Sequence, residues 1–213
     1  MLTPLLLLSL ALLAAPPEGV RVEDRIDLVH VDRRVLAVNA GGSLAEVELE
    51  VGERLIETHS QGLVAVASTS VRLLGASAER NGFRELRYRV EEREGPPRTV
   101  YLGDRVALVP LRTRLLALAP ESSQWNEIAL TPREDLLRVL IDTNLVAVIT
   151  PRRAIAFAPQ SGGFVEVALT PQESVEQSSV RDSSVVLTTS RRILIFRSGA
   201  PRWIERMRRV RHQ

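Results

Sequence analysis

The segment Asn144–Leu169, with the sequence NLVAVITPRRAIAFAPQSGGFVEVAL, contains three short apolar runs. Two of these runs are rich in β-branched residues, and the runs are separated by Thr-Pro-Arg and by Pro-Gln-Ser-Gly-Gly. Short apolar runs divided by such turn residues are typical of consecutive antiparallel strands. The segment therefore predicts an all-β arrangement with tight turns.

The end of this segment recurs along the chain. In each copy a bulky apolar residue, here called the anchor, is followed two places later by Glu. Successive anchors are 39, 42, 39 and 39 residues apart, and this regularity indicates a repeat protein. The pairs of anchor and Glu are Leu44 and Glu46, Phe83 and Glu85, Trp125 and Glu127, Phe164 and Glu166, and Trp203 and Glu205.

Each repeat contains four predicted strands, which in the fourth repeat are residues 138–141, 145–150, 154–157 and 164–169. The second and third strands are apolar almost throughout, whereas the fourth alternates. We therefore expect the two middle strands to be buried on both faces and the fourth to lie at an edge. The repeats are predicted at about 20–51, 52–95, 96–134, 135–173 and 174–213.

Five copies of a four-stranded antiparallel unit of about 39 residues resemble β-propeller repeats over residues 20–213. The resemblance implies an all-β, five-bladed β-propeller. The WD dipeptide and the paired glycines of kelch repeats are absent from the sequence, so the resemblance names no specific propeller family. A ring would have to close by packing of the fifth repeat on the first, or through a partner. A β-trefoil would show three repeats, and a sandwich would show none.

The first 15 residues are uncharged and apolar and end in small residues, which predicts a signal peptide at 1–15 followed by a linker at 16–19. The alternative is an uncleaved interfacial anchor. The chain has no cysteine, and all 28 basic residues are Arg, which favours an exported bacterial protein, periplasmic or secreted. The formal net charge is only +2, so no nucleic-acid partner is expected.

An Arg stands at the turn between the second and third strands of every repeat. These arginines should share one face of the disc, where guanidinium groups could bind an anionic ligand or a protein partner. The loops that join consecutive repeats reach the same face and are acidic, with Glu53, Glu92, Glu94, Glu134 and Glu173 among them. The alternative is therefore that each Arg forms an internal salt bridge. The five are Arg34, Arg72, Arg114, Arg153 and Arg192.

Trp125 and Trp203 could stack on sugar rings in clefts between blades, as in a lectin-like protein. Because Phe83, Phe164 and Leu44 occupy the same position in other repeats, packing at the edge of the core is the alternative.

Catalytic and metal-binding motifs are missing from the sequence, so no catalytic residue, metal or cofactor is predicted. A channel-centred hydrolase is the weakest alternative. It would use carboxylates such as Glu57 and Asp142, beside His59 and Tyr101, on the innermost strands.

The C-terminal stretch 202–213 contains five Arg and one Glu, so it could meet an anionic membrane or an acidic partner, or simply be a solvated strand edge. Membrane contact is expected only there or at an uncleaved N-terminus. The predicted function is that of an exported, non-catalytic binding or scaffold protein that uses one turn face of the propeller. Its partner is an unknown protein or an anionic ligand.

Overall fold

The computed structural model describes residues 25–42, 44–93, 99–181 and 183–208. The predicted signal peptide at 1–15, the linker at 16–19, the start of the first predicted repeat at 20–24 and the last five residues lie outside the described residues.

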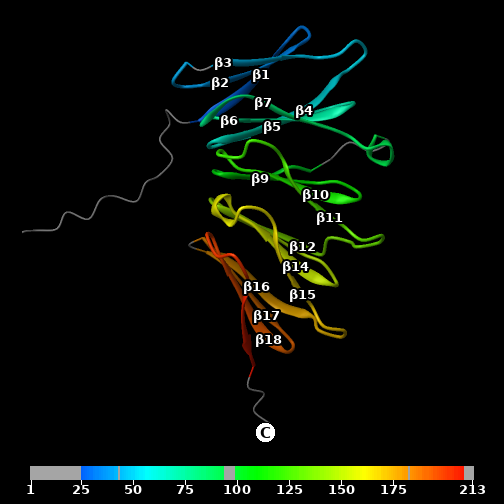
Figure 1. The fold of residues 1–213 in the computed structure, drawn as a ribbon, viewed down its shortest axis with the longest axis vertical. Helices are drawn as coiled ribbons and strands as arrows, with labels where there is room; N and C mark the ends of the chain where they lie inside the picture. Colours follow the sequence, from blue (N-terminus) through cyan, green and yellow to red (C-terminus); the bar gives the residue numbers. More distant parts are fainter. Residues whose placement is uncertain (1–24, 43, 94–98, 182, 209–213) are drawn as a thin grey trace, which may run out of the picture.

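The described strands form five antiparallel sheets, here called blades 1 to 5 in chain order (Figure 1). Blade 1 contains β1 (Ile26–Val31), β2 (Arg34–Asn39) and β3 (Leu44–Glu48). Blade 2 contains β4 (Leu55–Gln61), β5 (Val64–Thr69), β6 (Arg72–Ser77) and β7 (Arg80–Arg87). Blade 3 contains β8 (Tyr101–Gly103), β9 (Val106–Pro110), β10 (Arg114–Leu118) and β11 (Asn126–Ala129). Blade 4 contains β12 (Arg138–Asp142), β13 (Leu145–Ile149), β14 (Arg153–Phe157) and β15 (Val165–Ala168). Blade 5 contains β16 (Val175–Arg181), β17 (Ser184–Thr189), β18 (Arg192–Arg197) and β19 (Ile204–Met207).

This arrangement confirms the predicted all-β fold of five propeller-type units. In blades 2 to 5 the four strands pair in sequence order, and blade 1 shows three described strands in the same order. In blades 2 to 4 the apolar middle strands are buried on both faces, as β5 and β13 are along their whole length. In blades 1 and 5 they are buried on one face only. The last strands alternate, as β15 does. Two short 3-10 helices, η2 (Val90–Glu92) and η3 (Pro159–Ser161), lie in connecting loops.

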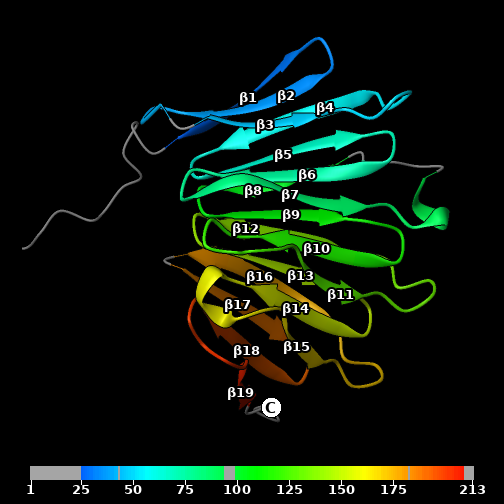
Figure 2. The same cartoon turned by 45° about the horizontal axis from the view of Figure 1, so that its top comes forward.

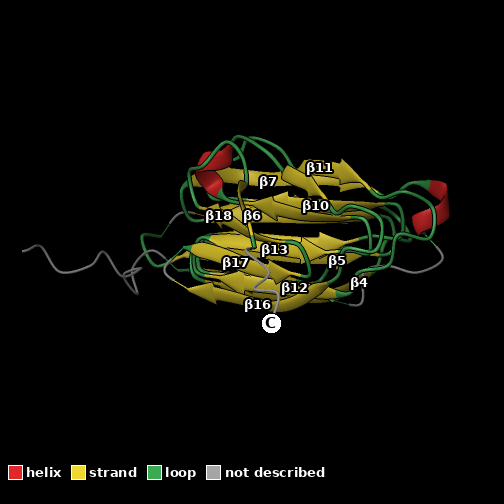
Figure 3. Cartoon of the chain, turned by 90° about the horizontal axis from the view of Figure 1, so that it is seen from below, coloured by secondary structure: helices red, strands yellow, loops and turns green. Residues whose placement is uncertain are grey.

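The core lies between the blades. Viewed along the row, the sheets overlie one another, with β4, β12 and β16 towards one edge and β7 and β11 towards the other (Figure 3). Side chains of neighbouring blades form separate apolar clusters, such as Leu108 and Leu115 of blade 3 with Val148 and Ile155 of blade 4. Because the internal sheets have two apolar faces, each internal blade is stabilised by packing against a neighbour on both sides.

The aromatic anchors fit against small residues of the preceding blade. A Cβ atom added to Gly75 on β6 would lie 2.8 Å from the Trp125 ring, so the indole fills the space that a side chain would need. Trp203 belongs to the same core cluster as Ala156. Each of these interfaces thus joins a large anchor to a small residue on the third strand of the blade before it.

A second set of contacts joins the blades at the turns between the first and second strands of each blade, on the face opposite to the repeated arginines. The backbone N–H of Leu63 donates to the carbonyl of Asp104 at 2.7 Å, and that of Arg105 donates to the carbonyl of Thr143 at 2.8 Å. The turns approach so closely that a Cβ atom on Gly103 would lie 2.2 Å from the carbonyl oxygen of Asp142. Position 103 therefore requires glycine, because the backbone of the next blade occupies the space that a side chain would need.

The row of blades is open within the described part of the chain. Blade 1 and blade 5 lie at opposite ends of the row in two views (Figures 1 and 2). The sequence left two routes to ring closure: packing of the fifth unit on the first within one chain, or closure through a partner. In the described residues the fifth unit does not pack on the first. In the same residues we find no helix with the length and apolar character needed to cross a bilayer.

Candidate functional site: arginine clusters and two open end faces

The repeated arginines form one kind of cluster, which is clearest in blade 4. Arg153 donates through Nε to Glu134 Oε1 at 2.8 Å and through Nη2 to Glu134 Oε2 at 2.9 Å. Nη2 also donates to the carbonyl of Ala129 in blade 3, and Nη1 pairs with Glu166 on β15. One guanidinium therefore joins its own blade, the preceding loop and the preceding blade.

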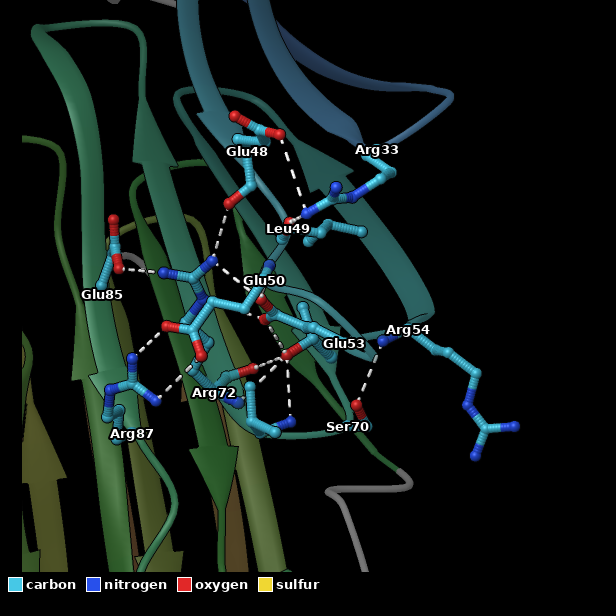
Figure 4. Close-up of polar contacts among 12 residues, drawn as sticks. Arg33, Glu48, Leu49, Glu50, Glu53, Arg54, Ser70, Arg72, Glu85 and Arg87 are labelled. Carbon is cyan, nitrogen blue, oxygen red and sulfur yellow. Dashed lines mark hydrogen bonds and ion pairs between the residues drawn. The ribbon is translucent and has the colours of Figure 1, made fainter.

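The same contacts recur in blades 2, 3 and 5. Figure 4 shows the blade 2 cluster, in which Arg72 contacts Glu53, Glu85 and the carbonyl of Glu48. Arg114 in blade 3 contacts Glu92, Glu127 and the carbonyl of Arg87, and Arg192 in blade 5 contacts Glu173, Glu205 and the carbonyl of Ala168.

The loop carboxylate is held by its own turn. In the loop before blade 4, the backbone N–H of Thr131 donates to Glu134 Oε2 at 2.9 Å. Thr150, at the end of β13, donates its hydroxyl to Glu134 Oε1 at 2.9 Å. Thr69 and Thr189 make the equivalent bonds to Glu53 and Glu173. Both carboxylate oxygens are thus satisfied by the chain itself, without an external ligand.

Burial and hydrogen bonding act in opposite directions on these carboxylates. Burial raises the pKa of Glu134, but hydrogen bonds from Arg153, the Thr131 backbone and Thr150 outweigh it and lower the pKa to about 2. Burial likewise raises the pKa of Glu173, and hydrogen bonds led by that from Arg192 lower it to about 2. The carboxylates are therefore ionised at neutral pH and act as fixed counter-charges.

These pKa values predict acid-sensitive stability. The folded-state pKa of Glu134 and Glu173 lies below the ordinary value of 4.5, so their contribution is fully present above about pH 5 and is lost as the pH falls towards 2. Each contributes on the order of 3 kcal/mol. Urea unfolding at pH 7, 5 and 3 should show the free energy of unfolding falling mainly below pH 5. The Glu134→Gln variant should show a shallower fall, and a parallel fall in both proteins would contradict this assignment.

The internal salt-bridge alternative therefore describes four of the five predicted binding arginines. The side chains of Arg72 and Arg114 are only 6% and 5% exposed, and those of Arg153 and Arg192 are 17% and 12% exposed. Arg34 differs, because its side chain is 61% exposed and pairs with Glu46 at 3.1 Å. A ligand-binding role for these arginines stays a prediction, and the donors of the four buried ones are directed to groups of the chain itself.

Two parts of these clusters are missing from the sequence-based prediction. The threonine at the end of the second strand looks like an ordinary strand residue, although its position three residues before the Arg recurs at Thr69, Thr150 and Thr189. The backbone carbonyl of the preceding blade that accepts from each Arg could not be predicted, because a main-chain group does not depend on the residue type at that position. In the loop before blade 3, Glu92 is the partner of Arg114, and Glu94 lies outside the described residues.

The two tryptophans are core residues. Trp125 is 6% exposed and Trp203 is 5% exposed. Their indole N–H groups donate to the carbonyls of Arg84 at 2.9 Å and of Val165 at 3.1 Å. Neither ring is free to stack on a sugar, so the structure replaces the lectin-like interpretation of these residues with core packing and interblade hydrogen bonding.

The residues of the hydrolase alternative are not brought together. His59 Nε2 lies 3.1 Å from Glu57 Oε2 on β4. Asp142 lies at the end of β12 and accepts from the backbone N–H of Thr143 and of Ser183. β8 packs between β4 and β12, which separates Glu57 from Asp142. No group of three potential metal ligands gathers among the described residues.

An open cleft of about 370 Å³ lies between blades 4 and 5, on the turn face that carries the arginines. Leu137, Arg138, Pro151 and Leu169 line it. Leu137 is 64% exposed, so an apolar side chain stands at its rim.

The outward sheet face of blade 1, here called the blade 1 end face, is not covered by another blade among the described residues. Val29, Val31 and Val38 on β1 and β2 are 45%, 47% and 37% exposed. The residues at the same repeat positions in blade 4, among them Val148 and Phe157, are 1% and 2% exposed. The blade 1 end face therefore has the character of an internal interface without the blade that would cover it.

The outward face of blade 5, here called the blade 5 end face, is uncovered in the same way. Val186, Ile193 and Ile195 are partly exposed, and Ile204 is 41% exposed. The positions equivalent to the first three in blade 4 hold Ala147, Ala154 and Ala156, which are no more than 1% exposed. Both ends of the row thus present apolar sheet surface to solvent.

Comparison with known proteins gives a likeness in fold. No protein-family model matches the chain, and no curated protein matches it in sequence. Among solved structures, apo AztD from Citrobacter koseri is similar at 16% identity and a TM-score of 0.40, over 87% of this chain and 63% of that chain. The Hsv2 protein of Kluyvelomyces marxianus is similar at 10% identity and a TM-score of 0.35, over 80% and 54%. The N-terminal domain of Nup159 is similar at 12% identity and a TM-score of 0.35, over 86% and 58%.

The chain thus spans less than two thirds of the length of these solved chains. At these identities and TM-scores the comparisons name no specific family for this chain.

Proposed function

We propose that this chain is a non-catalytic protein-binding module of the propeller type, and that its partner covers the end faces of the blade row. The observation that carries the proposal is the contrast between the uncovered end faces and the fully buried equivalent faces inside the row. A patch with an apolar centre and charged residues around it has the anatomy of a protein interface.

The partner should present a sheet face of its own. Both end faces are the surfaces of antiparallel sheets, and the other blades are covered by sheets that pack side chain against side chain. A protein whose apolar sheet surface matches this spacing would bury Val29 and Val38 at one end, or Ile193 and Ile195 at the other. Such burial supplies the main favourable free energy of association.

The turn face is the weaker candidate for the contact surface. Four of its five repeated arginines donate to carboxylates and carbonyls of the chain, which leaves the cleft beside Leu137 as its apolar feature. We also propose export to the periplasm or the medium. That part of the proposal rests on the composition of residues 1–15.

Site-specific photo-crosslinking in cells of the source organism tests the proposal. A photoreactive amino acid at position 29 or 195 is expected to give covalent adducts with protein, because these positions lie on the end faces. The same group at position 51 is the control, since Val51 is 92% exposed and lies in a turn away from both faces. Adducts from position 137 with none from 29 or 195 would favour the turn face. Adducts from none of the three would contradict a binding role.

A further inference from the structure

We propose that the partner is a second copy of this chain, bound head to tail, with the blade 5 end face of one copy packed on the blade 1 end face of the next. This inference rests on the proposed function and names the partner. Four observations on the two faces support it.

The first observation is the direction of the row. Each blade has one face towards blade 5 and one face towards blade 1. Every internal interface joins the face of one blade that points towards blade 5 to the face of the next blade that points towards blade 1. The blade 5 end face would point towards a following blade, and the blade 1 end face would point towards a preceding one. Contact between them repeats the internal geometry, whereas contact between two identical ends does not.

The second observation is charge. Arg181, Arg197 and Arg206 are exposed on the blade 5 end face, and they form no ion pair within the described part of the chain. The register of β1, β2 and β3 places Asp27, Glu46 and Glu48 on the blade 1 end face. Arg34 accompanies them and pairs with Glu46, and Arg33 in the adjoining turn lies 3.7 Å from Glu48. The basic face and the mainly acidic face are complementary, which favours head-to-tail contact over contact between like ends.

The third observation is residue size. Inside the row a large anchor meets a small residue, as Trp125 meets Gly75 and Trp203 meets Ala156. At the ends both residue types change in a compensating way. The anchor position of blade 1 holds Leu44, which is smaller than Phe or Trp, and the position equivalent to Ala156 holds Ile195, which is larger than Ala. The two changes are opposite in direction, so a smaller anchor would meet a larger residue in the head-to-tail contact.

The fourth observation is the arginine that lacks a preceding blade. Arg72 donates to the carbonyl of Glu48 at 2.9 Å, and Arg153 donates to that of Ala129 at 2.6 Å. The repeat spacing makes Met207 on β19 the equivalent of Ala129 and Ala168. In the head-to-tail contact, Arg34 of one copy would donate to the Met207 carbonyl of the other. Such a contact uses different surfaces on the two copies, so it produces a ring if the rotation closes and a filament if it does not.

Two complementary variants test the contact. Ile195→Glu blocks the blade 5 end face, and Val29→Glu blocks the blade 1 end face. Each variant alone should sediment as one protomer, and an equimolar mixture should give a species of twice that mass, because each variant retains one functional end. The unmodified protein should sediment as two or more protomers. Val51→Glu is the matched control and should associate like the unmodified protein, since it adds the same charge outside both faces.

A second pair of substitutions avoids the apolar centre. The double variant Arg197→Glu with Arg206→Glu should weaken self-association at least tenfold, and far-ultraviolet circular dichroism should confirm that each variant is folded. Association of Ile195→Glu with itself, or a mixture that stays at one protomer, would overturn the head-to-tail contact. An unmodified protein that sediments as one protomer up to about 100 µM would also overturn it. Photo-crosslinking of the end faces to a different protein would in that case still support the proposed function.

Discussion

Replacing Glu92 with Ala is expected to lower the free energy of unfolding by about 3–5 kcal/mol, because it removes the buried carboxylate that faces Arg114. The remaining carboxylate partner of Arg114, Glu127, is 38% exposed. The Arg114 side chain is 5% exposed, and Glu92 accepts hydrogen bonds from both its Nε and Nη2 atoms. Glu92 also accepts from the backbone N–H of Arg89, so the substitution releases the loop between blades 2 and 3. Urea unfolding at neutral pH measures the effect.

Glu91→Ala is the matched control, since Glu91 is exposed and adjacent in sequence. Its effect should stay within about 0.5 kcal/mol. The double variant Glu92→Ala with Arg114→Met should recover a large part of the loss, because it removes both buried charges. A loss of less than about 1 kcal/mol for Glu92→Ala alone would show that the cluster does not carry the blade interface.

Replacing Gly103 with Ala is expected to lower the free energy of unfolding by about 3 kcal/mol or more, since the clash involves backbone atoms of two blades. The new Cβ atom would lie 2.2 Å from the Asp142 carbonyl oxygen and 3.1 Å from that of Thr143. The Thr143 carbonyl cannot move without losing the hydrogen bond that it accepts from the Arg105 N–H. Blades 3 and 4 would have to separate at this turn. Thermal unfolding followed by circular dichroism measures the effect.

Gly41→Ala is the control for this substitution. A Cβ atom on Gly41 would meet only the side-chain oxygen of Asn39, at the ordinary distance of 3.5 Å. Its melting temperature should therefore stay close to that of the unmodified protein. Equal melting temperatures for Gly103→Ala and Gly41→Ala would contradict the close approach of the two turns.

The strands could be predicted because their signals are local. The predicted strand at 138–141 differs from β12 by one residue, and that at 145–150 differs from β13 by one residue. Runs of β-branched residues, the turn residues between them and the recurring anchors are all contained within one repeat. The same locality explains why all five units can be recognised in the amino-acid sequence.

The partners of the arginines could be predicted only as a class. The sequence places acidic loops near Arg153, but Glu134 and Asp135 stand side by side, and composition does not choose between them. Glu134 is chosen because the turn brings its carboxylate back onto the Thr131 N–H. The choice between a binding role and a salt bridge depends on burial, which a repeated Arg at a turn does not reveal.

The openness of the row could not be predicted from residue types. Val29 and Val38 look like the residues of a covered strand, and only their exposure distinguishes blade 1 from the internal blades. Core packing of Trp125 is one of the two interpretations that the sequence supports, but the space that Gly75 leaves for the ring in the preceding blade carries no signal in the repeat itself.

The most direct test of the head-to-tail contact uses the absence of cysteine from the sequence. Strands β9 and β13 contact each other across the interface of blades 3 and 4, and the equivalent strands at the two ends are β17 and β1. A Val186→Cys protein is mixed with a Val29→Cys protein and treated with a short thiol-specific crosslinker. We predict a crosslinked dimer in the mixture and little in either protein alone. Crosslinking of either variant with itself, or none in the mixture, would contradict the account.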